Sequence, residues 1–259
     1  MPETQIHPTA IVDPAAQLGT GVVVGPYCII GPDVVLGDGC RLQHHVTIQG
    51  PAKIGRNNVF FAYGSIAQQT QDLKYKGEPT YVEIGDDNSF REFVTVHRAT
   101  DVGNTTRIGN RGNFLAYSHI AHDCTVGDDV IFSNNATLGG HVTVGDHVII
   151  GGLSAIHQFC RIGRYAMLGG CTKIVQDVPP FMIADGNPAE IRGINKIGLE
   201  RHDFTPESVH EIKEAYRILY RMKLNVKDAT VQICEKRKPI PEITQLLEFL
   251  GTSERGIVR

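Results

Sequence analysis

Residues 121–156 read AHDCTV GDDVIF SNNATL GGHVTV GDHVII GGLSAI, six hexapeptides that each end in an aliphatic or aromatic residue. The spacing continues over most of the chain. Counting in sixes gives 10 such positions from Val12 to Ile66 and 16 from Ile84 to Ile174, and all 26 hold Ile, Val, Leu or Phe. Four positions after each of these anchors, the residue is never larger than Val. A fixed period of six predicts stacked repeats in a parallel β-helix, and alternating large and small residues suit a narrow, layered core.

Glycine follows the anchor in 14 of the 26 hexads. Because glycine tolerates backbone angles that other residues avoid, we expect the chain to turn a corner at these positions. Short strands joined by corners therefore make the chain mainly β.

Length and composition exclude several classes of protein. The 259 residues suffice for one or two domains, and the net charge of −3 without a basic run argues against a nucleic-acid partner. No stretch approaches 18 consecutive apolar residues, so no membrane span is expected. The segment Met1–Gln5 has neither the basic nor the apolar region of a signal peptide, so we expect a cytoplasmic protein.

Four of the six cysteines, at positions 28, 40, 124 and 160, occupy the small position of the repeat. We therefore expect them to point inward as core residues. Zinc-type cysteine spacings are absent from the sequence.

The repeat is interrupted at residues 67–83, where Asp72 and Glu78 replace the anchors. Long loops within compact repeats are usually functional or disordered. A functional loop is favoured, because Leu73 and Tyr75 could anchor it.

A second departure begins after about Pro188. Thr205 and Pro206 have the pattern of a helix N-cap followed by proline in the first turn. Further helices are expected at about 226–237 and from Pro241 to Gly251. Such helices would cap the open end of a stack of repeats. We therefore predict a β-helix domain at 1–190 and a C-terminal α-helical domain at 191–259.

The chain also contains several specific motifs, at 71–79 (QDLKYKGEP), 95–98 (TVHR), 119–124 (HIAHDC), 134–138 (NNATL), 140–141 (GH), 157–160 (HQFC) and 255–259 (RGIVR). These motifs resemble those of the UDP-N-acetylglucosamine O-acyltransferases of lipid A biosynthesis, a family of hexapeptide-repeat acyltransferases. The resemblance covers essentially the whole chain, and QDLKYKGEP, IAHDC and HQFC are its most specific parts.

The resemblance implies a left-handed parallel β-helix with three hexads in each coil. Residues three hexads apart then lie above one another, as His122, Gly140 and Gln158 would. At roughly 4.8 Å per coil, His141 and His157 would lie within about 10 Å of His122. The histidines of the coil region should all point outward.

The residues alone leave the role of this histidine cluster open. A histidine is largely neutral at pH 7 and can act as a general base. It is also a common zinc ligand, and hexapeptide-repeat carbonic anhydrases bind zinc between subunits. A zinc-dependent trimer of that kind is therefore the alternative enzyme, and a non-catalytic β-helix scaffold is the third hypothesis.

The family's activity would be transfer of an R-3-hydroxyacyl group from acyl carrier protein to the 3-hydroxyl of UDP-N-acetylglucosamine, the first step of lipid A biosynthesis. By matching motif, His122 would be the general base, Asp72 would orient it, and the Gly140 N–H would bind the oxyanion. The residues implied in binding sugar, diphosphate or acyl chain are Gln71, Lys74, His97, His119, His141, His157 and Gln158. Asn195 and Arg201 match nucleotide and phosphate contacts, whereas His202 replaces a second arginine that the family often has.

Further expectations also follow from the resemblance. Gly170 would lie at the end of the acyl groove and leave room for a longer chain. No cofactor or metal is expected beyond the acyl carrier protein thioester, and Arg161, Arg164 and Lys173 are candidate contacts for that acidic carrier. Because a convex prism offers no deep pocket, we expect a homotrimer with sites between subunits. The sequence does not decide between a 3-hydroxyl and a 3-amino acceptor.

Overall fold

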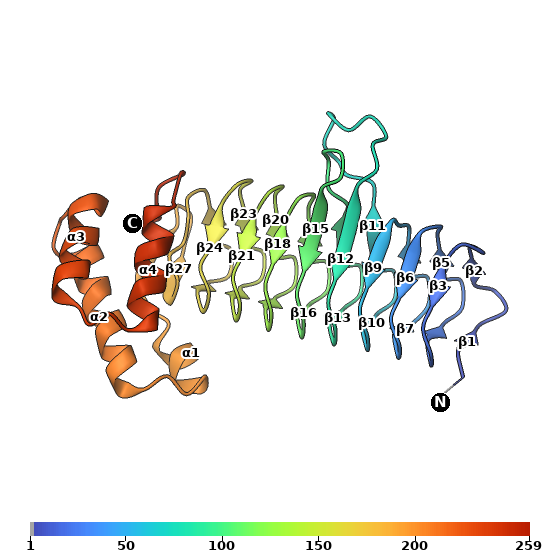
Figure 1. The fold of residues 1–259 in the computed structure, drawn as a ribbon, viewed down its shortest axis with the longest axis horizontal. Helices are drawn as coiled ribbons and strands as arrows, with labels where there is room; N and C mark the ends of the chain where they lie inside the picture. The colour runs from blue at the N-terminus through green and yellow to red at the C-terminus, as the bar shows by residue number, and fades with distance from the viewer. Residues whose placement is uncertain (1–2) are drawn as a thin grey trace.

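The computed structural model describes residues 3–259, which form a long three-sided prism followed by four helices (Figure 1). The chain visits three parallel sheets in turn, here called A, B and C, and returns to A after each coil. Sheet A contains β1 (Gln5–Ile6), β4 (Val23–Val24), β7 (Arg41–Leu42), β10 (Val59–Phe60), β13 (Ser89–Phe90), β16 (Asn113–Phe114), β19 (Ile131–Phe132), β22 (Ile149–Ile150), β25 (Met167–Leu168), β27 (Met182–Asp185) and β28 (Glu190–Ile194). Sheet B contains β2 (Ile11–Val12), β5 (Ile29–Ile30), β8 (Thr47–Ile48), β11 (Ser65–Gln68), β14 (Thr95–His97), β17 (His119–Ile120), β20 (Thr137–Leu138), β23 (Ala155–Ile156) and β26 (Lys173–Ile174). Sheet C contains β3 (Gln17–Leu18), β6 (Val34–Leu36), β9 (Ala52–Ile54), β12 (Tyr81–Ile84), β15 (Thr105–Ile108), β18 (Thr125–Val126), β21 (Thr143–Val144) and β24 (Arg161–Ile162).

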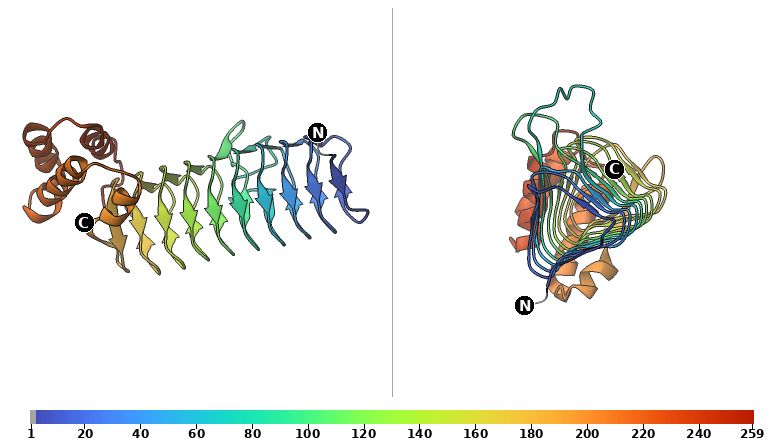
Figure 2. Two further views of the ribbon diagram at one scale, coloured as in Figure 1. Left: turned by 90° about the horizontal axis from the view of Figure 1, so that it is seen from below. Right: turned by 90° about the vertical axis from the view of Figure 1, so that its right-hand side faces the viewer.

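The register confirms three hexads per coil. His119 pairs with Thr137 and Thr137 pairs with Ala155, so each partner lies three hexads further along the chain. Of the 26 anchors, all but Val12, Leu18 and Val102 are buried. Cysteines 28, 40, 124 and 160 are buried as well, as predicted. The end-on view in Figure 2 shows the triangular outline that this layered core fills.

Two insertions leave the prism at the same corner, between sheets B and C. Ser65 pairs with Thr95, five hexads further on, and Thr95 pairs with His119, four hexads further on. The first of these coils therefore exceeds the regular three hexads by two, and the second exceeds it by one. The first loop spans 69–80 rather than the predicted 67–83, because β11 and β12 extend into its ends, and it projects from the prism in Figure 2.

The second insertion, at 98–104, was not predicted. Because it adds one whole hexad, it preserves the period of six, and Val102 falls at an anchor position in the count. In the structure Val102 is 66% exposed on the loop, and the prediction that it points inward was wrong.

The glycines after the anchors act differently from our expectation. The left-handed backbone angles of the corners occur two residues later, mostly at non-glycine residues such as Asp123 (φ 59°) and Asn135 (φ 61°). At Gly127, which follows an anchor, an added Cβ would lie 2.8 Å from the backbone nitrogen of Asp146 on the next coil. Glycine is needed there for close approach between coils rather than for a positive φ.

The C-terminal end is closed by a hairpin and helices. β27 pairs in parallel with β25, and β28, which crosses the predicted boundary at residue 190, pairs antiparallel with β27. The hairpin was not predicted, nor was the short α1 (Lys196–Arg201). The other three helices match the expected ranges: α2 (Pro206–Arg221), α3 (Val226–Lys236) and α4 (Pro241–Gly251). Among residues 3–259, no helix has the length and apolar character that crossing a membrane requires.

Buried Asp177 fastens the C-terminal tail to the last coil. Its carboxylate accepts hydrogen bonds from the Arg161 N–H (2.8 Å) and the Ser253 hydroxyl (2.8 Å). Its own N–H donates to the carbonyl of Gly256 at 2.9 Å. The tail is thus held against the same end of the prism as the helices.

Candidate active site

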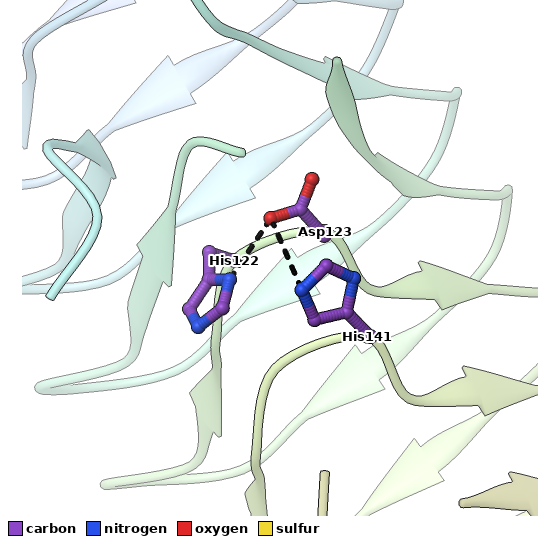
Figure 3. Close-up of side chains that lie close together, drawn as sticks. All are labelled: His122, Asp123 and His141. Atoms are coloured by element: carbon purple, nitrogen blue, oxygen red, sulfur yellow. Dashed lines mark hydrogen bonds and ion pairs between the residues drawn. The ribbon is translucent and has the colours of Figure 1, made fainter. Parts of the chain in front are cut away.

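The corner between sheets B and C holds a histidine and a carboxylate side by side. His122 and Asp123 lie just after the end of β17, and His141 lies on the next coil (Figure 3). One carboxylate oxygen of Asp123 is 2.9 Å from His122 Nδ1 and 3.8 Å from His141 Nε2. The Asp123 side chain is only 5% exposed and that of His122 13%. The contact at Nδ1 leaves Nε2 of His122 able to exchange a proton.

The insertion at 98–104 holds Asp123 in place. The N–H of Thr100 donates to one carboxylate oxygen at 3.0 Å, and the Asn104 side-chain amide donates to the other at 3.2 Å. The N–H of Asp123 donates to the Thr106 hydroxyl at 2.9 Å. Donors from two sides fix this carboxylate in direction. The insertion therefore supports the residue that orients His122.

Asp72 does not occupy the position that we predicted for it within one chain. Its carboxylate accepts from the N–H of Lys74 at 2.9 Å inside the 69–80 loop, and its N–H donates to the Thr70 hydroxyl at 3.1 Å. Within residues 3–259, the carboxylate bonded to His122 is that of Asp123, which our sequence reasoning missed. The sequence did contain an indication of this contact, because Asp123 directly follows the proposed base within the motif IAHDC.

Hydrogen bonds nevertheless connect the loop of Asp72 to the histidine. The hydroxyls of Thr70 and Thr100, both buried, are 2.9 Å apart. Thr100 in turn donates to Asp123. The two insertions therefore pack together over the B–C corner and share one network with His122.

Gly140 lies directly against the His122 ring, which confirms the predicted stacking of these two positions. An added Cβ would be 2.4 Å from His122 Nε2 and 2.3 Å from Cε1. No backbone acceptor is found for the Gly140 N–H in the described part of the chain. A donor beside the nitrogen that exchanges a proton is the arrangement that an oxyanion requires.

His97 lies one coil before His122, and His119 lies on the same coil as His122, in β17. His97 packs against His119 (ring centroids 4.9 Å apart) and is 6% exposed, so it is buried although it lies outside the core of the prism. Burial, together with the neighbouring His119 and His122, lowers the pKa of His97 to about 4. Burial and then His122 also lower the pKa of His119, whose Nδ1 is 2.7 Å from the Thr95 hydroxyl. Two neutral imidazoles therefore flank His122 at pH 7.

The buried Nδ1 of His97 has no hydrogen-bond partner within residues 3–259. A buried polar atom without a partner costs free energy unless a ligand or water supplies one. This atom is thus a place where a bound substrate would gain a hydrogen bond.

The remaining predicted contacts on this edge are more exposed. His141 stacks on Phe159, with ring centroids 4.6 Å apart. His157 and Gln158 are exposed one coil beyond His141, and Gln71 and Lys74 are exposed on the 69–80 loop. These groups extend the polar edge on both sides of His122.

Asn195, Arg201 and Gly170 lie away from the B–C corner. Asn195 is buried, caps α1 by accepting from the Gly198 N–H (3.1 Å), and donates to the carbonyl of Tyr165 at the C–A corner (2.9 Å). Arg201 is exposed in the last turn of α1. Gly170 follows β25 and therefore lies at the A–B corner. One chain does not bring these residues to His122.

Two further candidates have structural partners within the chain. His202 packs on His147 (ring centroids 4.6 Å apart) and on Tyr165. Arg161 stacks on Phe249 and donates to Thr252. Arg161 therefore fastens α4 to sheet C, which weakens its case as a contact for an acidic carrier protein.

The ligand atoms of His122, Asp123 and His141 lie within 4.8 Å of one another, so the cluster could hold a metal ion. The Asp123 carboxylate, however, already accepts hydrogen bonds from Thr100 and Asn104. This donor set fits a carboxylate that orients a histidine at least as well as it fits a metal ligand.

Known proteins resemble the chain over its full length. Residues 177–258 match the family model described as UDP N-acetylglucosamine O-acyltransferase, domain 2. A curated relative from Halorhodospira halophila, named acyl-[acyl-carrier-protein]–UDP-N-acetylglucosamine O-acyltransferase, is 47% identical over 257 residues, which cover 99% of this chain and 100% of the relative.

Solved structures agree with this relationship. LpxA of Acinetobacter baumannii is 46% identical, with a TM-score of 0.95 over 98% of this chain and 99% of that one. LpxA of Bacteroides fragilis, a UDP-N-acetylglucosamine acyltransferase, is 37% identical, with a TM-score of 0.97 over 98% and 100% of the two chains. The likeness confirms the left-handed parallel β-helix with a C-terminal helical region, and it does not favour the carbonic-anhydrase alternative. The chain therefore belongs to the family of UDP-N-acetylglucosamine O-acyltransferases.

Proposed function

We propose that this protein transfers an R-3-hydroxyacyl group from acyl carrier protein to the 3-hydroxyl of UDP-N-acetylglucosamine, as the first step of lipid A biosynthesis. The relatives' names supply the two substrates. The observation that carries the mechanism is the 2.9 Å contact between His122 Nδ1 and Asp123, with Gly140 against the same imidazole ring.

The reaction proceeds by direct attack of the sugar on the thioester. Nε2 of His122 takes the proton of the sugar 3-hydroxyl while that oxygen bonds to the thioester carbonyl carbon. Asp123 stabilises the resulting imidazolium. The carbonyl oxygen becomes an oxyanion, to which the Gly140 N–H donates. Collapse breaks the C–S bond, and the departing thiolate takes the proton from His122, leaving a 3-O-acyl sugar and the free carrier thiol.

The buried cysteines do not suit an acyl-cysteine intermediate. Burial raises the pKa of the Cys124 thiol to about 12 and that of Cys160 to about 11. A thiol must ionise to become a nucleophile, and both side chains point into the core. Direct attack requires no cofactor or metal, and we propose that the enzyme uses none.

The complete site is formed by more than one copy of the chain, and we propose a homotrimer. His122, Gly170 and Asn195 lie on three different corners of one prism, yet the family's pattern assigns all three to one substrate pair. Leu73, at the tip of the 69–80 loop, is fully exposed, as expected of a residue that a neighbouring copy covers. Gln71, Asp72 and Lys74 on the same loop would then act at the boundary between subunits. We also propose that the enzyme acts in the cytoplasm.

The proposal is tested by an acyl-transfer assay with UDP-N-acetylglucosamine and hydroxyacyl carrier proteins of several chain lengths. Because general base catalysis typically contributes 10² to 10⁴ in rate, His122→Ala should lower kcat by about 10³. Activity that disappears on treatment with a chelator and returns with zinc would instead support the metal hypothesis. A His122→Ala variant with the activity of the unmodified enzyme would remove the proposed base.

The same assay tests Gly170. An added Cβ there meets only the carbonyl oxygen of Gly152, at 3.5 Å, so a larger side chain fits without distorting the coil. Gly170→Met should shift the preference toward shorter donors. An unchanged preference would show that the acyl chain ends elsewhere.

A further inference from the structure

The C-terminal tail places a guanidinium group at the end of the polar edge that begins at His122. Nη2 of Arg255 lies 3.4 Å from His157 Nδ1 and 3.4 Å from the carbonyl oxygen of Val175. His157 is one coil beyond His141 and Val175 one coil further. At about 4.8 Å per coil, this guanidinium is roughly 10 to 15 Å along the edge from His122.

Several bonds fix the tail on both sides of Arg255. The Ser253 hydroxyl donates to Asp177, and the Gly256 carbonyl accepts from the Asp177 N–H. The carbonyl of Arg255 itself accepts from the Gln176 side chain at 3.5 Å. The backbone at Arg255 is therefore positioned by the fold, although its side chain is exposed.

The charge of Arg255 is not neutralised within the chain. No carboxylate of residues 3–259 lies within ion-pair distance of it. His157 Nδ1 is also close to the Gln158 carbonyl oxygen, at the shorter distance of 3.1 Å. If Nδ1 carries the proton and donates to that carbonyl, it cannot accept from Arg255. The guanidinium then keeps the long contact to Val175 and a contact to the Cys160 thiol, and it retains free donors.

We propose that Arg255, together with His157, forms an anion subsite that binds a phosphate group of a substrate. This inference rests on the proposed function for the identity of the ligand. Guanidinium groups bind phosphate through paired N–H donors. Two substrates could supply the phosphate: the sugar nucleotide through its diphosphate, or the carrier protein through the phosphodiester of its pantetheine arm. The subsite would hold that phosphate while the reacting group lies at His122.

The test is steady-state kinetics of Arg255→Ala, with each substrate varied separately. Because hydrogen bonds to charged groups are stronger than those between neutral groups, KM for the substrate whose phosphate binds here should rise about tenfold or more, with kcat little changed. Arg255→Lys should restore part of the loss, since it keeps the charge but not the paired donors. Glu254→Ala is the matched control, because this neighbouring exposed residue of the tail lies outside the subsite.

The two sources of phosphate are separated by the donor. If the pantetheine phosphate binds here, the KM of acyl-phosphopantetheine rises in the variant, whereas that of acyl-pantetheine, which lacks the phosphate, does not. If the diphosphate binds here, the KM of UDP-N-acetylglucosamine rises instead. Unchanged KM values for both substrates, or a fall in kcat alone, would overturn the subsite.

Two controls keep this test independent of folding and of the proposed activity. Thermal melting reports whether Arg255→Ala is folded. If Arg255→Ala is unfolded, Arg255→Gln is used in its place, because glutamine retains a polar group without the charge. Calorimetric titration of the whole protein with UDP-N-acetylglucosamine and with 4′-phosphopantetheine measures binding without turnover. If the unmodified protein shows no acyltransferase activity but binds one of these ligands, and Arg255→Ala does not bind it, the subsite is supported and the proposed reaction is refuted. Equal binding of these ligands by the unmodified protein and by Arg255→Ala would refute the subsite.

Discussion

Where no insertion interrupts them, the C–A and B–C corners of the prism turn in the same way, but their backbone N–H groups are hydrogen-bonded differently. At the C–A corner, the N–H of the second residue after the anchor is repeatedly capped by a side chain of the next coil. The donor and acceptor pairs are Thr20 with Asp38 (2.7 Å), Arg56 with Asp86 (2.7 Å), Asp86 with Asn110 (2.8 Å), Asn110 with Asp128 (2.8 Å) and Asp128 with Asp146 (3.0 Å). At the B–C corner, Gly140 occupies the equivalent position, lies against the His122 ring and has no such cap on its N–H.

The difference shows how one repeat supports both stability and chemistry. Asx side chains at the C–A corner satisfy the donors of the coil, so that corner stabilises the stack. At the B–C corner the carboxylate of Asp123 is directed to a histidine, and the equivalent donor stays free for a ligand. A corner becomes a site when its polar groups are fixed but not fully paired.

The substitution Asp123→Asn tests this difference between the two corners most directly and should have the largest effect. The amide oxygen can still accept from Thr100, so the fold should persist, but the negative charge beside His122 is lost. Without it the imidazolium is not stabilised and the ring can adopt the wrong tautomer. We expect kcat to fall about 10²- to 10³-fold at nearly unchanged KM. Activity within twofold of the unmodified enzyme would show that another carboxylate orients His122.

Gly140→Ala tests the contact between the free donor and the histidine. The new methyl group would overlap the His122 ring, which must move away from its place beside the N–H. We expect kcat to fall about 10²-fold, because loss of one oxyanion donor typically costs that much. The melting temperature should change little, since the ring can rotate toward solvent. Gly193→Ala, where an added Cβ meets nothing within 4 Å, is the control that should leave kcat unchanged.

Acid should weaken the B–C corner before it weakens the C–A corner. The unfolded His97 titrates near 6.5 and the folded one near 4, because burial and the neighbouring histidines lower its pKa. Between these values the unfolded chain binds the proton and the folded chain does not, so stability is lost as the pH falls from about 6.5 to about 4. Down to pH 5 the loss should be about 2 kcal/mol.

The measurement is denaturant unfolding at pH 7.5 and pH 5, at one protein concentration. Because His97→Gln removes this titration, the variant should lose about 2 kcal/mol less than the unmodified protein over the same interval. The pKa of His119 is also lowered by burial, so part of the acid sensitivity should remain in the variant. Equal losses by both proteins would mean that His97 is not buried in solution.

The repeat predicted most of the fold because its period fixes which side chains face inward. The same period concealed the insertion at 98–104, since one added hexad keeps every later anchor in phase. The sequence placed His122, Gly140 and Gln158 on one line, and the aspartate directly after His122 was its one indication of which carboxylate reaches the base. The hydrogen bonds that direct Asp123 come from the insertion at 98–104, which the period of six concealed. Gly170 and Asn195 belong to corners that one chain cannot bring together, and a linear sequence contains no register between chains.

Replacement of an aspartate by asparagine at the C–A corner should have the smallest effect. Asp86 accepts from the Arg56 N–H and pairs with its guanidinium, and these hydrogen bonds lower the pKa of Asp86. Asp86→Asn keeps an oxygen that can accept from that N–H, as Asn110 does one coil later. Because exposed ion pairs contribute about 0 to 1 kcal/mol, stability should fall by less than about 1 kcal/mol, with kcat unchanged. Asp86→Ala, which removes the cap itself, should cost about 1 kcal/mol more. A loss of activity in Asp86→Asn comparable to that of Asp123→Asn would show that charge on the prism acts at long range, and that the division between a structural and a chemical corner is wrong.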